Sequence, residues 1–155
     1  MKFIVACVGK PRDKPLAQAT QEYETRAARY WPLEVKEVRE EPARGAAAGL
    51  VRDREGERLL GCFDARTHVV ACDAAGEGFT SDAFAAWMQR QRERAAADVA
   101  LVIGGALGLG DAVRVRAATH LSLGAWTLPH ELARLVLAEQ LYRAGTIVRG
   151  EPYHK

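Results

Sequence analysis

The run Val99–Ile103 contains no polar residue, and it restricts the fold of this chain more than any other segment. A strand that is apolar on both faces is typical of a parallel sheet covered by helices on both sides. Elsewhere, short apolar segments with strand character alternate with longer charged segments of helical character. This alternation predicts an α/β domain with a mostly parallel sheet flanked by helices.

The bounds of these elements are expected from apolar periodicity and from helix-ending residues such as Pro32. Ser81 or Asp82 can cap the third helix, because a side-chain oxygen at that position accepts from a free amide of the first turn. Residues 73–80 are expected to form a loop. Strands are expected at residues 2–8, 33–38, 68–72, 99–103 and 121–126, and helices at residues 16–30, 50–63, 81–97 and from 129 onward.

The length of 155 residues fits a single domain, and no repeat, low-complexity tract or linker divides the chain. We therefore expect residues 1–155 to fold as one domain. The hydrophobic fraction of 48% and the charged fraction of 27% are those of a soluble globular protein. No segment approaches the roughly 20 apolar residues of a membrane span. The apolar run at the N-terminus is too short for a signal peptide, so we expect a cytoplasmic protein without a membrane partner.

The cysteines Cys7, Cys62 and Cys72 are odd in number and widely spaced, which argues against a disulfide framework or a zinc site. The four histidines also lack metal-ligand spacing, so we expect no bound metal. Buried, reduced thiols are the favoured interpretation of the cysteines. The net charge of +2 gives no overall basic field that would indicate nucleic acid as a partner.

A glycine-rich segment, residues 104–110, follows the apolar run. It matches neither the dinucleotide-binding fingerprint nor the phosphate loop of nucleotide-hydrolysing enzymes. In open α/β sheets, however, ligands bind at the carboxyl ends of the strands, and glycines let the backbone approach a ligand closely. A ligand-binding loop and a tight structural turn both explain this segment.

The segment from Pro129 to Arg143 is apolar over more than one helical face, which predicts a helix buried in a core or in a subunit interface. Glu139 and Arg143 have the i, i+4 spacing of an ion pair. On a largely buried helix, both charges must be paired or used, whereas a solvated pair on one exposed stripe is the alternative. His130 is interpreted as a helix-start residue rather than as a catalytic group.

The C-terminal residues 149–155 contain charged, aromatic and titratable side chains. Tyr153 has the ring needed to stack on a nucleobase, and His154 titrates near neutral pH and can move a proton. A tail that merely aids solubility is the alternative interpretation.

Three segments late in the chain, together with the strand followed by Gly104-Gly105, resemble one known family. These segments are Leu-Ser-Leu-Gly-Ala-Trp-Thr-Leu-Pro-His at 121–130, Leu-Ala-Glu-Gln-Leu-Tyr-Arg-Ala at 137–144 and Arg-Gly-Glu-Pro-Tyr-His-Lys at 149–155. The pattern is similar to the large-subunit (23S) ribosomal RNA pseudouridine N3-methyltransferases, which belong to the SPOUT methyltransferases. The resemblance extends over the whole chain, with weaker motifs in its N-terminal part.

This resemblance implies an α/β fold with a C-terminal trefoil knot, a homodimer, and methylation of N3 of a pseudouridine in 23S ribosomal RNA on the assembled ribosome. It also implies S-adenosylmethionine as the cofactor. Two departures from the family concern fine loop geometry: Cys72 replaces a larger aliphatic residue, and Ala106 and Leu107 follow the glycine pair. The cofactor-binding residues implied are Cys72, Gly104, Leu123, Gly124, Ala125, Trp126, Thr127 and Leu128.

The same resemblance suggests a composite site, in which the tail of one subunit completes the pocket of the other. We expect Arg143 to stabilise the anion that develops on the base, with Glu139 positioning Arg143. His154 is the expected general base or proton relay, and Tyr153 is expected to hold or stack the flipped base.

Two other functions stay open on the sequence. One is a SPOUT methyltransferase that acts on another ribosomal nucleotide or on transfer RNA. The other is a ribosome-binding factor that has the fold without catalysis. Analysis of modified nucleosides separates the first from the expected activity, and a test of cofactor binding separates the second.

Overall fold

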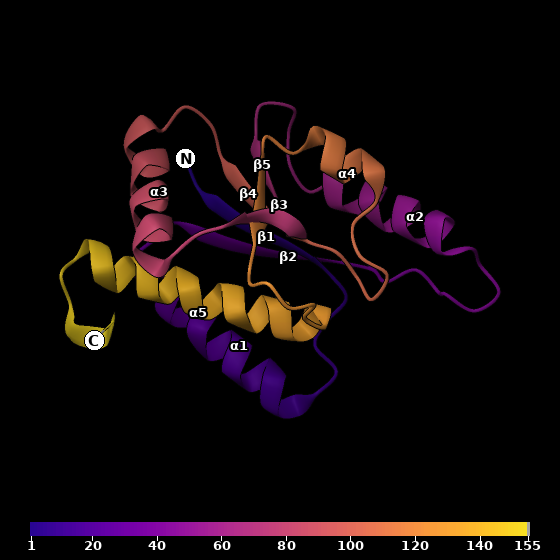
Figure 1. Cartoon of the computed structure of the whole chain (residues 1–155), viewed down its shortest axis with the longest axis horizontal. Helices are drawn as coiled ribbons and strands as arrows, with labels where there is room; N and C mark the ends of the chain where they lie inside the picture. Colours follow the sequence, from indigo (N-terminus) through magenta and orange to yellow (C-terminus); the bar gives the residue numbers. More distant parts are fainter. Residues whose placement is uncertain (155) are drawn as a thin grey trace.

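A computed structural model describes residues 1–154, and the side chains of residues 1–153. Five parallel strands form one sheet in the order β2-β1-β4-β3-β5, with helices on both faces (Figure 1). This confirms the predicted α/β class. The elements are β1 (Phe3–Val8), α1 (Lys14–Ala27), β2 (Leu33–Val38), α2 (Ala48–Leu60), β3 (His68–Gly78), α3 (Ser81–Arg94), β4 (Val99–Ile103), α4 (Asp111–Arg116), β5 (Thr119–Ser122), α5 (His130–Val148) and the 3-10 turn η1 (Pro152–His154).

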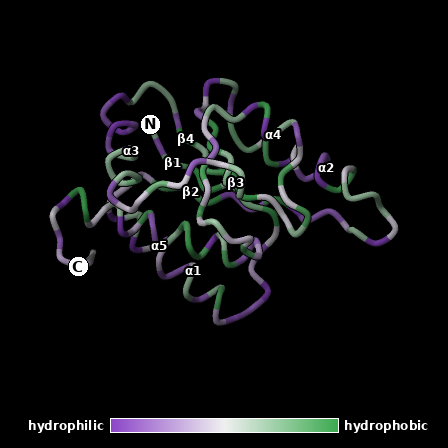
Figure 2. Tube along the Cα trace, in the orientation of Figure 1, coloured by the Kyte–Doolittle hydropathy of each residue, from purple (hydrophilic) through white to green (hydrophobic). Residues whose placement is uncertain are grey.

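Side chains of β1 and β4 alternate between two apolar cores, one on each face of the sheet. Phe3 and Leu101 point to the core shared with α1, α3 and α5, whereas Ile4 and Val102 point to the core shared with α2 and α4. Every residue of these two strands is buried. The hydropathy colouring of Figure 2 accordingly places green, apolar segments at the sheet and purple segments around the periphery. The predicted strand 99–103 is therefore confirmed, together with the reason for its composition.

Arg134 fixes the first half of α5 to the neighbouring elements. Its guanidinium donates from Nε to Glu24 of α1 at 2.8 Å and from Nη1 to Glu37 of β2 at 2.7 Å. The side chain is 8% exposed, so its charge is compensated by these two carboxylates rather than by water. Helix α5 is thereby fixed against both α1 and the sheet.

Strand β3 continues to Gly78, so the prediction of a loop at residues 73–80 was wrong. Cys72 and Glu77 both pair with Leu121 of β5, and the residues between them bulge out of the ladder. A Cβ at Gly76 would lie 2.6 Å from the carbonyl carbon of His120, so the close approach of the two chains requires glycine there. Pairing between strands distant in sequence overrode the loop-like composition.

Strand β5 ends at Ser122, which corrects the expected strand 121–126. The Ser122 hydroxyl donates to the carbonyl of Gly124 at 2.7 Å, and this local turn replaces the ladder. Helix α3 is capped by Thr80, whose side chain accepts from the amide of Ala83, rather than by Ser81 or Asp82. The helix ends at Arg94 because Ala95 is left-handed, with φ +45°.

Helix α1 begins earlier than the predicted residue 16, because Asp13 caps it by accepting from the amide of Leu16. It also ends earlier than the predicted residue 30, at Ala27. Helix α2 likewise begins and ends earlier than residues 50–63. The six-residue helix α4 was not predicted at all. Of the helices in residues 1–154, none has the length and apolar composition needed to cross a membrane.

Candidate active site

A cavity of about 470 Å³ lies at the carboxyl end of β4, within the range typical of small-molecule sites. Its walls come from residues 103–109, from residues 127–128, and from the start of α5. A smaller pocket of about 110 Å³ adjoins it and shares Cys72, Thr127, Leu128 and Ala133. The two pockets lie where ligands bind in parallel α/β sheets, because the carboxyl ends of the strands leave a crevice between loops.

Seven of the eight residues predicted to bind cofactor line one or both pockets. Cys72, Gly104, Thr127 and Leu128 line the larger pocket, and the smaller pocket adds the residues Leu123, Gly124 and Trp126. Ala125 lines neither of them. The structure thus brings together segments that are more than fifty positions apart in the chain, and their role toward a cofactor stays a prediction.

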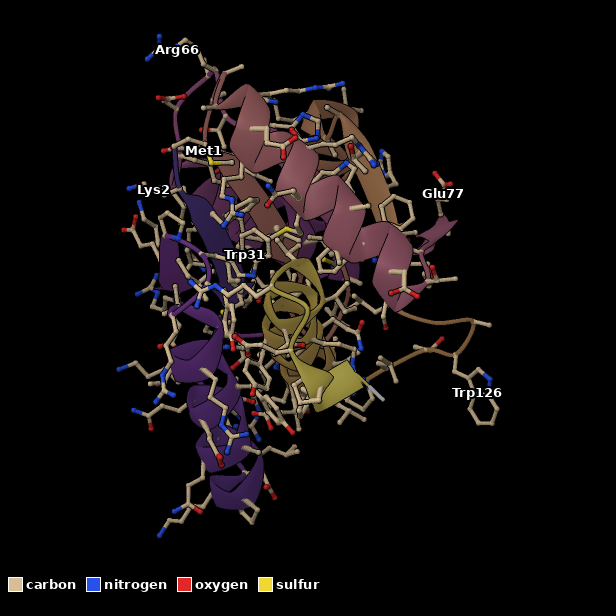
Figure 3. The ribbon with its side chains drawn as sticks, turned by 90° about the vertical axis from the view of Figure 1, so that its left-hand side faces the viewer. Met1, Lys2, Trp31, Arg66, Glu77 and Trp126 are labelled. Atoms are coloured by element: carbon tan, nitrogen blue, oxygen red, sulfur yellow. The ribbon has the colours of Figure 1, made fainter. Side chains whose placement is uncertain are left out.

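The Trp126 side chain differs from the other predicted residues because it points away from the body of the molecule (Figure 3). It is 83% exposed. In a single copy of the chain, the contribution of Trp126 to the pocket therefore comes from its backbone rather than from its indole ring.

Cys72 forms an apolar part of the wall. Burial raises the pKa of its thiol to about 12, so the sulfur is a neutral thiol near pH 7. A protonated thiol is a poor nucleophile and a poor metal ligand. Within residues 1–154, no group of three or more His, Cys, Asp or Glu side chains could hold a metal ion.

Several residues that line the two pockets were not predicted as part of a site. His130 and Ala133, from the first turn of α5, line the larger pocket, and Asp73 lines the smaller one. Burial opposes the charge of Asp73, but hydrogen bonds from the amide of Ala75 and from Arg114 lower its pKa overall. The helix start at His130 was recognisable in the sequence, whereas Asp73 is held by Arg114 of the unpredicted helix α4.

Glu139 and Arg143 form a second cluster, further along α5 than the pocket. Arg143 donates to Glu139 Oε1 from Nε at 2.9 Å and from Nη2 at 2.6 Å, which confirms the predicted ion pair. The Tyr153 hydroxyl donates to the same oxygen at 3.1 Å. The Arg143 guanidinium also lies 4.9 Å from the centroid of the Tyr153 ring. Three of the four predicted catalytic residues therefore lie in contact.

The side chain of His154, the fourth predicted catalytic residue, lies outside the described part of the chain. Its backbone belongs to the turn η1, directly after Tyr153.

The charge states in this cluster follow from its contacts. Burial, followed by a hydrogen bond with Tyr23, raises the pKa of Tyr153, which keeps this phenol a neutral donor. The hydrogen bond to Glu139 raises the pKa of Arg143, so the guanidinium stays cationic. The Tyr153 ring also packs on Tyr142, with centroids 4.6 Å apart. The cluster presents a fixed cation beside a neutral hydrogen-bonding ring.

The tail, residues 149–153, is held in this position by contacts with α1 and with the residues that follow this helix. Tyr30 donates to the carboxylate of Glu151, and the Arg149 guanidinium lies 4.6 Å from the Tyr30 ring centroid. The turn after α5 uses Gly150 at φ +69°, a conformation that favours glycine. This turn lets the chain fold back so that Tyr153 reaches α5.

The pocket lies at the N-terminal end of α5, whereas Glu139 lies at the middle of this helix and Arg143 in its second half. The tail that carries Tyr153 follows the opposite end of α5 (Figure 1). His130 lines the pocket, and Arg143 lies 13 positions further along the helix, which corresponds to roughly 20 Å at the rise of an α-helix. Within one copy, the Glu139–Arg143–Tyr153 cluster therefore does not contribute to the pocket at the carboxyl end of β4.

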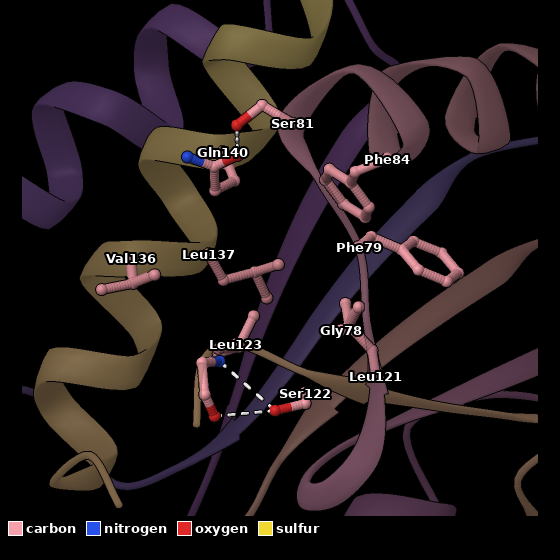
Figure 4. Close-up of a pocket in the computed structure, with 11 residues that line it drawn as sticks. Gly78, Phe79, Ser81, Phe84, Leu121, Ser122, Leu123, Val136, Leu137 and Gln140 are labelled. Carbon is pink, nitrogen blue, oxygen red and sulfur yellow. Dashed lines mark hydrogen bonds between the residues drawn. The ribbon is translucent and has the colours of Figure 1, made fainter. Parts of the chain in front are cut away.

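A further pocket of about 240 Å³ lies between the start of α3, the end of β5 and α5 (Figure 4). Its lining is largely apolar, and the Ser81 hydroxyl donates to Gln140 Oε1 at 2.7 Å, so these two polar groups satisfy each other. It shares Leu123 and Gly124 with the pocket of about 110 Å³.

Comparison with known proteins agrees with this architecture. A family model described as a predicted SPOUT methyltransferase matches residues 1–154. The chain therefore belongs to the SPOUT methyltransferase family, and this membership implies the trefoil knot predicted for its C-terminal part.

Within that family, the chain is similar over its full length to proteins named ribosomal RNA large subunit methyltransferase H. It is 59% identical to the protein from Gemmatimonas aurantiaca over 155 residues, which is 100% of both chains. It is 48% identical to the protein from Anaeromyxobacter sp. strain Fw109-5, again over 100% of both chains. It is 42% identical to the protein from Geobacter metallireducens over 154 residues, or 99% of each chain.

Proposed function

We propose that this protein transfers a methyl group from S-adenosylmethionine to N3 of a pseudouridine in 23S ribosomal RNA, and that it does so on the assembled ribosome in the cytoplasm. Relatives of the same length carry the name ribosomal RNA large subunit methyltransferase H, which supports a ribosomal RNA substrate. The observation that carries the proposal is the cavity of about 470 Å³ beside Gly104, at the strand ends where ligands of parallel sheets bind.

The residues of this cavity suit the cofactor. Glycine at position 104 keeps the backbone free of a side chain, and Cys72 with Leu128 supplies an apolar surface for an adenine ring. The backbone of residues 123–128 lies at the smaller pocket and offers amide and carbonyl groups for hydrogen bonds. When bound, the cofactor supplies an electrophilic methyl group, and the protein supplies position and proton handling.

The tail cluster suits the nucleobase. N3 of pseudouridine carries a proton, so methylation requires its loss and stabilisation of the resulting negative charge. Arg143, held by Glu139, places a permanent cation where it can stabilise charge on the neighbouring carbonyl oxygens. Tyr153 supplies a ring and a neutral hydroxyl for a base flipped out of its stack. His154 accepts the proton in this scheme.

A homodimer joins the two parts of the site. Because no residue of the tail cluster lines the pocket, and Arg143 is roughly 20 Å along α5 from His130, the cluster serves the pocket of a second copy rather than its own. Two features support this arrangement: Trp126 is exposed beside the pocket, and α5 keeps the apolar residues Leu132, Leu135 and Val136 partly exposed. Exposed tryptophan and apolar helix faces are frequent at subunit interfaces.

The experiment that tests the function uses ribosomes from a strain that lacks the corresponding gene. The protein is incubated with labelled S-adenosylmethionine and either 70S ribosomes or protein-free ribosomal RNA, and the nucleosides are identified by mass spectrometry. We expect N3-methylpseudouridine from the 23S RNA, with stronger labelling of ribosomes. Label in another nucleotide or in transfer RNA would contradict the substrate, and failure to bind the cofactor would favour a non-catalytic ribosome-binding factor.

A further inference from the structure

Glu55 is a buried carboxylate on α2, on the face of the sheet opposite α5. It is 3% exposed. Its Oε1 accepts a buried hydrogen bond from the amide of Glu41 at 3.0 Å. Within the part of the chain that the structure describes, no donor reaches its Oε2. A buried carboxylate oxygen without a hydrogen bond costs folding free energy, and the hydrogen bond from the Glu41 amide to Oε1 does not account for the position of Oε2.

The free oxygen of Glu55 lies directly behind the glycine pair that lines the cavity. A Cβ placed on Gly105 would be 2.6 Å from Glu55 Oε2 and 3.1 Å from Val8 Cγ1. Separations below 3.0 Å are essentially absent from real structures, so a side chain at Gly105 requires either the loop or the Glu55 carboxylate to shift. The hydrogen bond from the Glu41 amide to Oε1 opposes a shift of that carboxylate. Gly105 itself lines the cavity of about 470 Å³. A displacement of Gly105 away from Glu55 would therefore change the shape of that wall.

Helix α2 also holds the segment that precedes it. The carboxylate of Glu41, which is 9% exposed, accepts from Arg54 at 2.8 Å and also pairs with Arg58. Further along the glycine-rich segment, a Cβ on Gly110 would lie 2.8 Å from the carbonyl oxygen of Arg52. Residues 104–110 and the backbone at Glu41 thus rest on the same helix, and Glu55 contacts both.

We propose that Glu55 is a positioning residue for cofactor binding, which fixes the Gly104–Gly105 wall of the pocket by contact with Gly105 while its other oxygen holds the backbone at Glu41. This inference rests on the proposed use of S-adenosylmethionine at that pocket. Glu55 does not line the cavity, so it acts through the loop rather than on the cofactor.

The test is a double-mutant cycle, with the dissociation constant of S-adenosylmethionine measured by calorimetry. Gly105→Ala places a methyl group against the Glu55 carboxylate and Val8. If Glu55 holds its position, the loop moves, and we expect binding to weaken about tenfold or more. Glu55→Ala removes the contact behind the loop and the acceptor for Glu41, and we also expect weaker binding. In the double variant Gly105→Ala/Glu55→Ala, the new methyl group occupies space that the carboxylate has left. We therefore expect the double variant to bind the cofactor more tightly than Gly105→Ala alone.

The controls separate positioning from general stability. Glu55→Gln keeps the size and the acceptor for Glu41, so its affinity should stay within threefold of the unmodified protein. Two control variants are on the same helix. Glu57→Ala changes an exposed side chain, and Gly49→Ala adds a methyl group where nothing obstructs it, so both should leave the affinity for the cofactor unchanged. Thermal unfolding without cofactor is followed in parallel, and the recovered affinity of the double variant must not simply track the melting temperature.

A double variant that binds as weakly as Gly105→Ala, or more weakly, would overturn the proposal. If Glu55→Ala does not fold, Glu55→Asp supplies the same cycle, because its shorter side chain withdraws the carboxylate from Gly105. If the unmodified protein itself does not bind S-adenosylmethionine, the proposed function fails. If the unmodified protein and all variants bind it equally, the role of Glu55 fails instead, so the two failures are distinguishable.

Discussion

The hydroxyl of Tyr153 donates to Glu139 Oε1 at 3.1 Å, so the tail is joined to a residue of α5 fourteen positions earlier in the chain. The same carboxylate oxygen accepts both hydrogen bonds from Arg143. One acceptor thus organises the cation and the ring that the proposed reaction uses, and each of these contacts can be removed separately.

Tyr153→Phe removes the hydroxyl but keeps the ring against Tyr142 and beneath Arg143. A hydrogen bond to a charged group contributes about 1.5–3 kcal/mol, so we expect turnover on ribosomes to fall roughly tenfold or more. The affinity for S-adenosylmethionine should change less than about twofold, because Tyr153 does not line the pocket and is proposed to contact the nucleobase rather than the cofactor. Single-turnover rates and calorimetry measure the two effects. A loss of cofactor affinity with unchanged turnover would contradict this role.

Arg143→Lys keeps the positive charge but loses the planar guanidinium that bonds Glu139 through two nitrogens. We expect the rate of methyl transfer to fall by about 10²-fold, the usual effect of removing a positioned group that stabilises a developing anion. Arg90→Lys, at an exposed position of α3, is the matched control and should retain full activity. Equal activity of the two variants would remove Arg143 from the mechanism.

Gly145→Ala tests the contact between the second half of α5 and Tyr30, which follows the end of α1. The new Cβ would lie 2.3 Å from Tyr30 Cγ, and Tyr30 cannot withdraw without disturbing its hydrogen bond to Glu151. We expect a loss of about 1–3 kcal/mol in the free energy of unfolding, which exceeds the gain in helix propensity of roughly 1 kcal/mol. Gly49→Ala, with open space around it, should be neutral or stabilising in urea denaturation. Similar values for both substitutions would contradict the packing argument.

His68 makes the stability depend on pH. Burial, with a smaller contribution from the charge of Arg116, lowers the pKa of His68 in the folded protein. Because the unfolded chain then binds a proton more readily, this contribution to stability is complete above the unfolded pKa of about 6.5 and is lost as the pH falls below it. The free energy of unfolding should decrease from about pH 7.5 to about pH 5.5 by less in His68→Gln than in the unmodified protein. An equal decrease in both proteins would exclude His68 as a source.

Local patterns in the sequence were sufficient to predict the alternation of strands and helices. The strand 99–103 and the Glu139–Arg143 ion pair follow from neighbours in the chain, and both are confirmed. The extension of β3 to Gly78 was missed because it exists through pairing with β5, some forty residues later. Such pairing leaves a weak local signal: Gly76 makes room for the close approach, but a glycine in a polar segment equally indicates a turn.

The site residues that lie in the family motifs were predictable from the sequence. The residues that reach the site only through tertiary contacts were not. The clustering of Tyr153 with Glu139 depends on the turn at Gly150, which no spacing rule predicts. Glu55 was hidden for a different reason: on a charged amphipathic helix, a buried glutamate looks like its exposed neighbours. Its burial becomes visible only when α2 packs beneath the glycine-rich segment.

The most direct test of the account uses mixed dimers of two inactive variants. Gly104→Ala disrupts the pocket, since its Cβ would lie 2.6 Å from the Gly108 backbone, and Arg143→Ala removes the cation of the tail cluster. If each site combines the pocket of one subunit with the tail of its partner, a mixed dimer contains one intact site. After random exchange of subunits, we predict about one quarter of the activity of the unmodified protein. Mixtures that stay as inactive as either variant alone would contradict a site shared between two copies.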